Sequence, residues 1–130
     1  MILIIGGACQ GKKGFARELS GMDEKAFSSN MAHGADDCPE DAWKKRFLIG
    51  FHQWIRRTLE EGKDPEEFVR QVLKAGPEIV TMDEVGCGIV PIERAERDYR
   101  EAAGRAGQML AGHARQVYRV VCGIPVKIKG

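Results

Sequence analysis

Residues 1–13 read Met-Ile-Leu-Ile-Ile-Gly-Gly-Ala-Cys-Gln-Gly-Lys-Lys, a short apolar run followed directly by a glycine-rich stretch. The apolar run, Met1 to Ile5, has the length of a buried parallel strand and is too short for a core helix. From Gly6 to Lys12 the spacing matches G-x-x-x-x-G-K, the phosphate-binding loop that joins a strand to a helix. This stretch therefore predicts an α/β fold with a phosphate site at the end of its first strand.

The loop supplies three kinds of phosphate-binding group. Its glycines let the backbone turn tightly and direct N–H groups inward. Lys12 would reach the β- and γ-phosphates, and a helix over residues 13–19 would direct its N-terminal end toward the anion. The predicted nucleotide-binding residues of the loop are Gly6, Gly7, Ala8, Cys9, Gln10, Gly11, Lys12 and Lys13. The alternative is that the glycines form only a turn between strand and helix.

Lys13 departs from the phosphate-loop motif. The motif has Ser or Thr at this position, because that hydroxyl is a ligand of Mg²⁺. A lysine cannot coordinate a cation and would repel one. The sequence therefore predicts bound GTP or ATP as the cofactor and makes a role for Mg²⁺ doubtful.

Composition narrows the class of protein. The 130 residues are enough for one domain with a proper core, and the net charge of +1 gives no indication of nucleic acid as a partner. No apolar run approaches membrane-spanning length, and no basic segment precedes the first apolar run, so we expect a cytoplasmic protein. The four cysteines are widely spaced and form no C-x-x-C pair, which favours reduced thiols over a zinc site or disulfides.

Hydrophobic periodicity and turn residues divide the chain into alternating strands and helices. After the first strand, the predicted strands are residues 25–28, 47–51, 78–82, 117–122 and 126–129, the last two as a hairpin. The predicted helices are residues 13–19, 51–61, 65–75 and 93–114, with an acidic loop over 31–41 and a helical turn after Pro39. A helix continuing from Ala42 is the alternative to the strand at 47–51. This order predicts a mainly parallel sheet with an antiparallel C-terminal edge.

Two carboxylates, Asp83 and Glu84, follow the predicted strand 78–82. An apolar strand that ends in an acid resembles the second nucleotide-site motif of phosphate-loop enzymes, in which the carboxylate manages Mg²⁺. We therefore predict Asp83 and Glu84 as metal-site residues. A glycine-hinged loop over 86–91 follows, where open α/β sheets place ligands. Gly104 and Gly107, inside the long helix, predict close approach by the sheet or by a neighbouring subunit.

Two histidines are the candidate catalytic residues. His33 lies in the acidic loop, where Asp36 or Asp37 would hold one ring nitrogen and leave the other as a nucleophile. His52 lies at a strand–helix junction, with Arg56 one helical turn further on as a phosphate ligand. The alternatives are an ordinary exposed loop histidine at position 33 and a hydrogen-bonded helix-start histidine at position 52.

Three further stretches carry a distinctive pattern: Glu84-Val-Gly-Cys-Gly-Ile-Val-Pro91, Tyr99-Arg-Glu-Ala-Ala-Gly-Arg105 and Val120-Val-Cys-Gly-Ile-Pro-Val-Lys-Ile-Lys129. Together with the N-terminal loop they closely resemble the adenosylcobinamide kinase/adenosylcobinamide-phosphate guanylyltransferases of cobalamin biosynthesis. The resemblance covers residues 1 to about 20 and 78 to 129. It implies a P-loop NTPase-like (RecA-like) three-layer fold, a homotrimer, and nucleotide bound at the loop and near Ser28, Ser29 and Asn30.

The resemblance also implies two reactions. One is phosphorylation of the aminopropanol hydroxyl of adenosylcobinamide, and the other is transfer of GMP from GTP through a guanylyl-histidine, with release of pyrophosphate. Family enzymes are typically longer, and this chain lacks much of the segment that carries the guanylylated histidine, which leaves His33 and His52 as substitutes. Two functions are therefore predicted: a compact enzyme of this family, or a nucleotide- or corrinoid-binding sensor or partner subunit without the chemistry.

Overall fold

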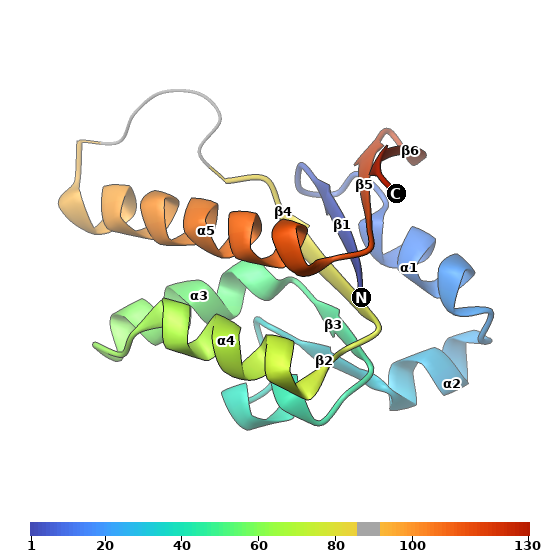
Figure 1. Cartoon of the computed structure of the whole chain (residues 1–130), viewed down its shortest axis with the longest axis horizontal. Helices are drawn as coiled ribbons and strands as arrows, with labels where there is room; N and C mark the ends of the chain where they lie inside the picture. Colours follow the sequence, from blue (N-terminus) through green and yellow to red (C-terminus); the bar gives the residue numbers. More distant parts are fainter. Residues whose placement is uncertain (86–91) are drawn as a thin grey trace.

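The fold is taken from a computed structural model, which describes residues 1–85 and 92–130 (Figure 1). Within these residues a six-stranded sheet has the order β2-β3-β4-β1-β5-β6. Neighbouring strands run parallel except for β6, which is antiparallel to β5. The strands are β1 (Ile2–Gly6), β2 (Met31–His33), β3 (Phe47–Ile49), β4 (Ile79–Asp83), β5 (Gln116–Val121) and β6 (Ile124–Lys129). The predicted mainly parallel α/β sheet with an antiparallel C-terminal hairpin is confirmed.

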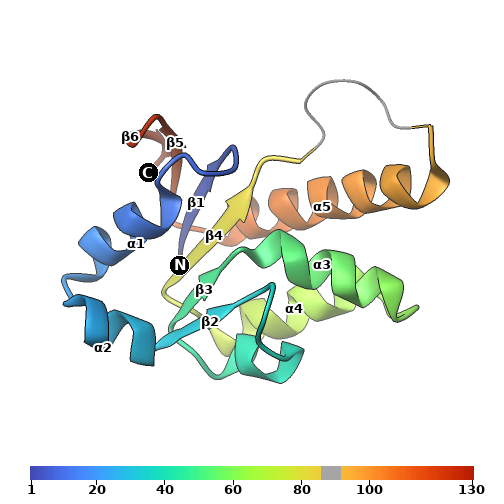
Figure 2. The ribbon, with the colours of Figure 1, turned by 180° about the vertical axis from the view of Figure 1, so that it is seen from behind.

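Helices cover both faces of the sheet and make three layers. They are α1 (Lys12–Ser20), α2 (Glu24–Ser29), α3 (Phe51–Glu60), α4 (Pro65–Ala75) and α5 (Arg94–His113), with a 3₁₀ turn, η1 (Pro39–Trp43). One core cluster joins α3, α4 and α5 to one sheet face, where Leu3 and Val80 are buried. The other joins α1 and α2 to the opposite face through Ala16 and Phe27. Figure 2 shows β2 and β3 toward one side of the molecule and the β5–β6 hairpin on the other.

The helix boundaries follow from local chemistry. Asp64 caps α4 by accepting a hydrogen bond from the Glu66 N–H at 3.0 Å, and Pro65 takes the first helical position, as predicted. Helix α3 instead begins after Gly50, whose φ of 69° lies in the left-handed region. A left-handed residue turns the chain sharply, so β3 passes directly into α3 at the edge of the sheet where parallel strands end.

Two element predictions on the N-terminal side were wrong. Residues 25–28, predicted as a strand, lie in α2, because Asp23 caps that helix by accepting from the Ala26 N–H at 2.8 Å. The second strand is instead β2, inside the segment predicted as a loop over 31–41. Its central residue, Ala32, is buried beside Leu48 of β3. A strand of three residues is too short to produce a readable alternation of polar and apolar side chains.

The remaining predictions need smaller changes. The third strand ends at Ile49, so Phe51 belongs to α3, and the helical turn predicted after Pro39 is η1. The predicted loop over 86–91 lies outside the described residues.

None of the described helices has the length and apolar character needed to cross a membrane.

Within residues 1–85 and 92–130, no backbone closely approaches Gly104 or Gly107 of α5. A Cβ at Gly104 would meet no heavy atom of the described residues within 4 Å, and one at Gly107 would only touch the Met82 sulfur at 4.0 Å. Replacing Gly104 with alanine is therefore expected to raise the free energy of unfolding by about 0.5–1 kcal/mol, since alanine has the higher helix propensity. Urea unfolding measures this change, and a lower stability would mean that another subunit packs on Gly104.

Candidate phosphate-binding site

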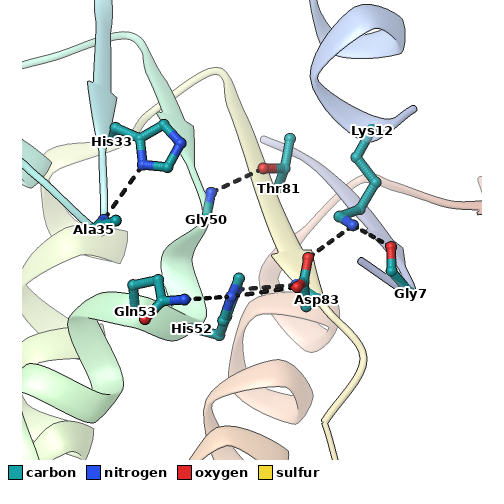
Figure 3. Close-up of polar contacts among 9 residues, drawn as sticks. All are labelled: Gly7, Lys12, His33, Ala35, Gly50, His52, Gln53, Thr81 and Asp83. Atoms are coloured by element: carbon teal, nitrogen blue, oxygen red, sulfur yellow. Dashed lines mark hydrogen bonds and ion pairs between the residues drawn. The ribbon is translucent and has the colours of Figure 1, made fainter. Parts of the chain in front are cut away.

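A cavity of about 370 Å³ opens at the ends of β1, β3 and β4, against the start of α1 (Figure 3). The strands are parallel, so their carboxyl ends meet at one edge of the sheet, where α/β folds bind ligands. The cavity is lined by the loop residues Ala8, Cys9, Gln10, Gly11, Lys12, Lys13 and Gly14 and, from the other side, by His33, Ile49, Gly50, His52, Gln53, Thr81 and Asp83. The structure thus brings both candidate histidines and one candidate carboxylate to the loop.

The loop backbone is fixed by the β5–β6 hairpin. A Cβ at Gly6 would lie 2.5 Å from the Val120 carbonyl oxygen, so only glycine lets the loop leave β1 this close to β5. The side-chain oxygen of Gln10 accepts from the Cys122 N–H at 2.6 Å, and its backbone oxygen accepts from the Gly123 N–H at 2.9 Å. These contacts join the loop to a turn more than 100 residues later, and the sequence offers no local signal for them.

Lys12 is buried, with 8% of its surface exposed, at the start of α1. Its ammonium group donates to the Gly7 carbonyl oxygen at 2.6 Å and pairs with Asp83 Oδ1 at 2.7 Å (Figure 3). Strand pairing explains the second contact, because Gly6 is in register with Asp83. The loop lysine and the acid at the end of β4 therefore neutralise each other across neighbouring strands.

His52 contacts Asp83 through both of its ring nitrogens. Its Nδ1 accepts the Asp83 backbone N–H at 3.1 Å, and its Nε2 lies 3.4 Å from Asp83 Oδ2. A neutral imidazole carries one N–H, so with Nδ1 accepting, Nε2 carries the proton and faces the carboxylate. The Gln53 amide nitrogen lies 3.2 Å from Nε2, and rotation of that amide presents its oxygen as a second acceptor. In this arrangement neither nitrogen of His52 offers a free lone pair.

Burial lowers the pKa of His52 below its ordinary value of 6.5; the Asp83 carboxylate opposes this effect, and Lys12 adds to it. The unfolded chain then binds a proton at this histidine more readily than the folded one. The free energy of unfolding should therefore fall as the pH drops below about 6.5, and this loss is complete once the pH is below the lowered pKa.

Urea unfolding over the range from about pH 7.5 to about pH 5 tests this pH dependence. The expected result is a smaller loss of stability in His52→Asn, which keeps an acceptor near the Nδ1 position, than in the wild type. The matched control is His113→Asn, on an exposed histidine at the end of α5, which should keep the wild-type slope. Equal slopes in all three proteins would contradict the prediction.

His33 lies across the cavity from the loop, at the end of β2. Its ring Nδ1 accepts from the Ala35 N–H at 3.3 Å, and Asp37 accepts from the His33 backbone N–H at 2.6 Å. The acidic partner predicted for the ring therefore holds the backbone instead. As at His52, Nδ1 accepts from a backbone N–H, which assigns the proton of the neutral ring to Nε2. A nucleophilic Nε2 needs the opposite tautomer.

The two predicted metal carboxylates have cationic or N–H partners already. Asp83 has Lys12 on one oxygen and His52 close to the other. Glu84 forms a two-point ion pair with Arg119 of β5, at 2.7 and 3.2 Å. Within residues 1–85 and 92–130, no three His, Cys, Asp or Glu side chains are grouped as metal ligands. Lys13 also presents a positive charge where the motif has a hydroxyl, so the described residues do not fit Mg²⁺.

Four predicted nucleotide-binding residues lie away from this cavity. Arg56 points to the α3–α5 side, where it makes a two-point ion pair with Glu96 and its guanidinium carbon lies 3.9 Å from the centre of the Tyr99 ring. The other three, Ser28, Ser29 and Asn30, end α2 rather than a strand. Of these, Ser28 lines a second cavity beside Lys13.

Sequence reasoning missed two polar side chains of the cavity wall, Thr81 and Gln53. The Thr81 hydroxyl accepts the Gly50 N–H at 3.0 Å and so fixes the β3–α3 turn to β4. Gln53 lies beside His52 on the first turn of α3. Gln53 could have been predicted, because it is the residue next to a candidate histidine. Thr81 lies in the middle of an apolar strand, where a buried hydroxyl is hard to distinguish from an ordinary strand residue.

A sequence model of the family described as "Cobinamide kinase / cobinamide phosphate guanyltransferase" matches residues 37–128, well over half of the chain. The chain belongs to this family. Members of the family are P-loop NTPase-like, in agreement with the sheet and the loop described above.

Two curated relatives share parts of the sequence. The bifunctional adenosylcobalamin biosynthesis protein CobU of Escherichia coli K12 is 51% identical over 51 residues, which are 39% of this chain and 28% of that protein. The protein of the same name from Salmonella typhimurium LT2 is 41% identical over an alignment of 83 positions, which covers 59% of this chain and 44% of that protein. The match therefore spans less than half the length of either relative.

The family match and the resemblance seen in the sequence cover different parts of the chain. The resemblance left out residues 37–77, which the family match includes, so the middle of the chain is more family-like than predicted. The match begins after the phosphate loop. The assignment of the loop accordingly depends on its own motif and on the contacts of Lys12.

Proposed function

We propose that this chain binds a nucleoside triphosphate, GTP or ATP, with its phosphates in the cavity at the end of β1. The observation that carries the proposal is Lys12, a buried ammonium group at the N-terminal end of α1 that lines a cavity of about 370 Å³ beside the glycine-rich loop. Backbone N–H groups and the helix dipole favour an anion at the same point. Lys12 would exchange Asp83 for a phosphate oxygen, which is also negatively charged.

The kinase and guanylyltransferase activities in the family description give the first candidate function. In it, the nucleotide donates a phosphoryl or GMP group to the side chain of adenosylcobinamide or its phosphate. Family membership supports this role, and so does a cavity wide enough to be lined from both the loop and α3. The corrinoid substrate would enter from the open side of the cavity.

The second candidate is a nucleotide- or corrinoid-binding sensor or partner subunit without chemistry. Three observations favour it. Lys13 replaces the metal-binding hydroxyl, both Asp83 oxygens face a proton donor or cation, and neither His33 nor His52 presents a lone pair in the arrangement described. Phosphoryl transfer depends on a metal-binding site, and nucleotidyl transfer through a covalent intermediate depends on a nucleophile with a free lone pair.

Calorimetric titration with GTP and with ATP tests the proposed binding. Intact-mass analysis after incubation with GTP then separates the two candidates, because a covalent guanylyl-histidine adds the mass of one GMP. A mass gain that disappears in His52→Asn or His33→Asn would establish the transferase. Binding with no mass gain and no phosphorylation of adenosylcobinamide favours the sensor, and the absence of binding to either nucleotide contradicts the proposal.

We also propose that the chain self-associates, as the resemblance to a homotrimeric family implies. Strand β6 exposes a row of alternate apolar side chains, Ile124, Val126 and Ile128, each more than half exposed. An apolar edge strand is a common site of pairing between chains. Val126→Glu is expected to shift the protein toward monomer in sedimentation velocity. The control, Lys127→Glu on the alternate side of β6, should leave the assembly unchanged, and no effect of Val126→Glu would exclude β6 from the interface.

A further inference from the structure

The charges around the loop cavity differ from those of a magnesium-dependent phosphate site. Lys12 and Lys13 are consecutive residues at the start of α1, and both line the cavity. Lys12 is buried, whereas Lys13 is exposed and also lines the adjoining cavity next to Ser28. Among residues 1–85 and 92–130, no carboxylate forms an ion pair with Lys13. The Lys13 ammonium group is therefore available to an anion that enters either cavity.

Among the described residues, the oxygen atoms near the cavity are not arranged to hold a metal. Mg²⁺ requires oxygen ligands in near-octahedral geometry, commonly one or two carboxylates with waters and phosphate oxygens. Here Asp83 faces Lys12 and His52, and Glu84 is paired with Arg119. The Thr81 hydroxyl, the one side-chain alcohol among the described residues that line the cavity, already accepts the Gly50 N–H. A cation at this point would displace existing partners and would approach Lys13.

We infer that the cavity binds a polyphosphate anion without a metal ion, and that the Lys13 ammonium group supplies the positive charge that Mg²⁺ supplies elsewhere. This inference depends on the proposed function, since it concerns the same cavity. An ammonium group donates hydrogen bonds to phosphate oxygens and needs no ligands of its own. Mg²⁺ in solution lowers the negative charge of the polyphosphate, so it competes with Lys12 and Lys13 instead of assisting them.

Titration calorimetry with three ligands, GTP, ATP and inorganic tripolyphosphate, tests the inference. Each ligand is titrated in excess EDTA and in excess Mg²⁺. The expected result is binding in EDTA that is at least as tight as binding in Mg²⁺. Comparable affinity for tripolyphosphate and the nucleotides would assign the recognition to the phosphates alone. Tighter binding of one nucleotide than of tripolyphosphate would indicate a further contact to its base or ribose. The comparison between EDTA and Mg²⁺ would test the inference in the same way for that nucleotide.

Two variants make the test specific to Lys13. Lys13→Ser restores the hydroxyl of the motif and is expected to weaken metal-free binding about tenfold, the loss of one charge-assisted contact. The same variant should bind more tightly in Mg²⁺ than in EDTA, which reverses the wild-type order. Lys74→Ser, on an exposed lysine at the end of α4, removes the same charge away from the cavity and should change neither affinity.

The outcomes separate the inference from the proposed function. Wild-type binding that requires Mg²⁺, or that Mg²⁺ tightens, overturns the metal-free site and leaves nucleotide binding in place. Equal metal-free affinity of the wild type and Lys13→Ser excludes Lys13 as the counter-charge. Failure to bind any of the three ligands under either condition overturns the proposed function itself. Thermal melting of each variant verifies that Lys13→Ser and Lys74→Ser are folded during the titrations.

Discussion

Replacing Gly34 with alanine is expected to lower the free energy of unfolding by about 3 kcal/mol. Gly34 follows β2, and a Cβ at this position would lie 2.2 Å from the Gly50 carbonyl oxygen. The obstacle is backbone, so relief requires the end of β2 to move away from the β3–α3 turn. The Gly34 N–H also donates to the Ile49 carbonyl oxygen at 2.8 Å, a bond that such a movement breaks.

Urea unfolding measures this loss, and thermal melting should show a decrease of about 10 °C or more. Gly104→Ala is the matched control, because the same substitution at an uncrowded helical position should stabilise the chain. An unchanged stability of Gly34→Ala would contradict the close packing of these two segments. Since the two segments carry His33 and His52, the same variant should also weaken nucleotide binding.

Replacing Lys12 with methionine is expected to weaken the binding of GTP and ATP by at least about 30-fold, or about 2 kcal/mol. Methionine keeps much of the apolar stem, which is buried against the loop, and removes only the ammonium group. That group is the buried cation of the cavity, with a distance of 2.7 Å to the Asp83 carboxylate. Without it, the Asp83 charge faces the incoming phosphates directly and adds repulsion to the lost contact.

Calorimetric titration of the purified variant measures this change. Lys74→Met serves as the control, because it removes one positive charge from an exposed site and should keep the wild-type affinity. Binding of Lys12→Met at the wild-type affinity would mean that the phosphates bind elsewhere, and the second cavity beside Ser28 would then be the first alternative.

The sequence predicted the parts of the site that local chemistry determines. The spacing from Gly6 to Lys12 is a contiguous signal, and its glycines are required by the approach of Val120 and by the left-handed conformation of Gly11. The Asp64 cap and the acid at the end of β4 could also be predicted from the sequence, since each depends on residues within one turn or one strand. The short strand β2 was missed because three residues carry too little pattern.

Only the tertiary structure determined which of these groups contact each other. The pairing of Lys12 with Asp83 arises because β1 and β4 are neighbours in register, and the position of His52 arises because Gly50 turns β3 into α3 at the same edge. The tertiary structure also placed Arg56 on the α3–α5 side, away from the cavity, and it fixed the histidine tautomers through backbone N–H groups. The sequence by itself therefore determined the phosphate-loop motif and the charges that it carries. The folded chain decided which of those charges are already neutralised, because ion pairs and hydrogen bonds across strands depend on distances that only the packed sheet defines.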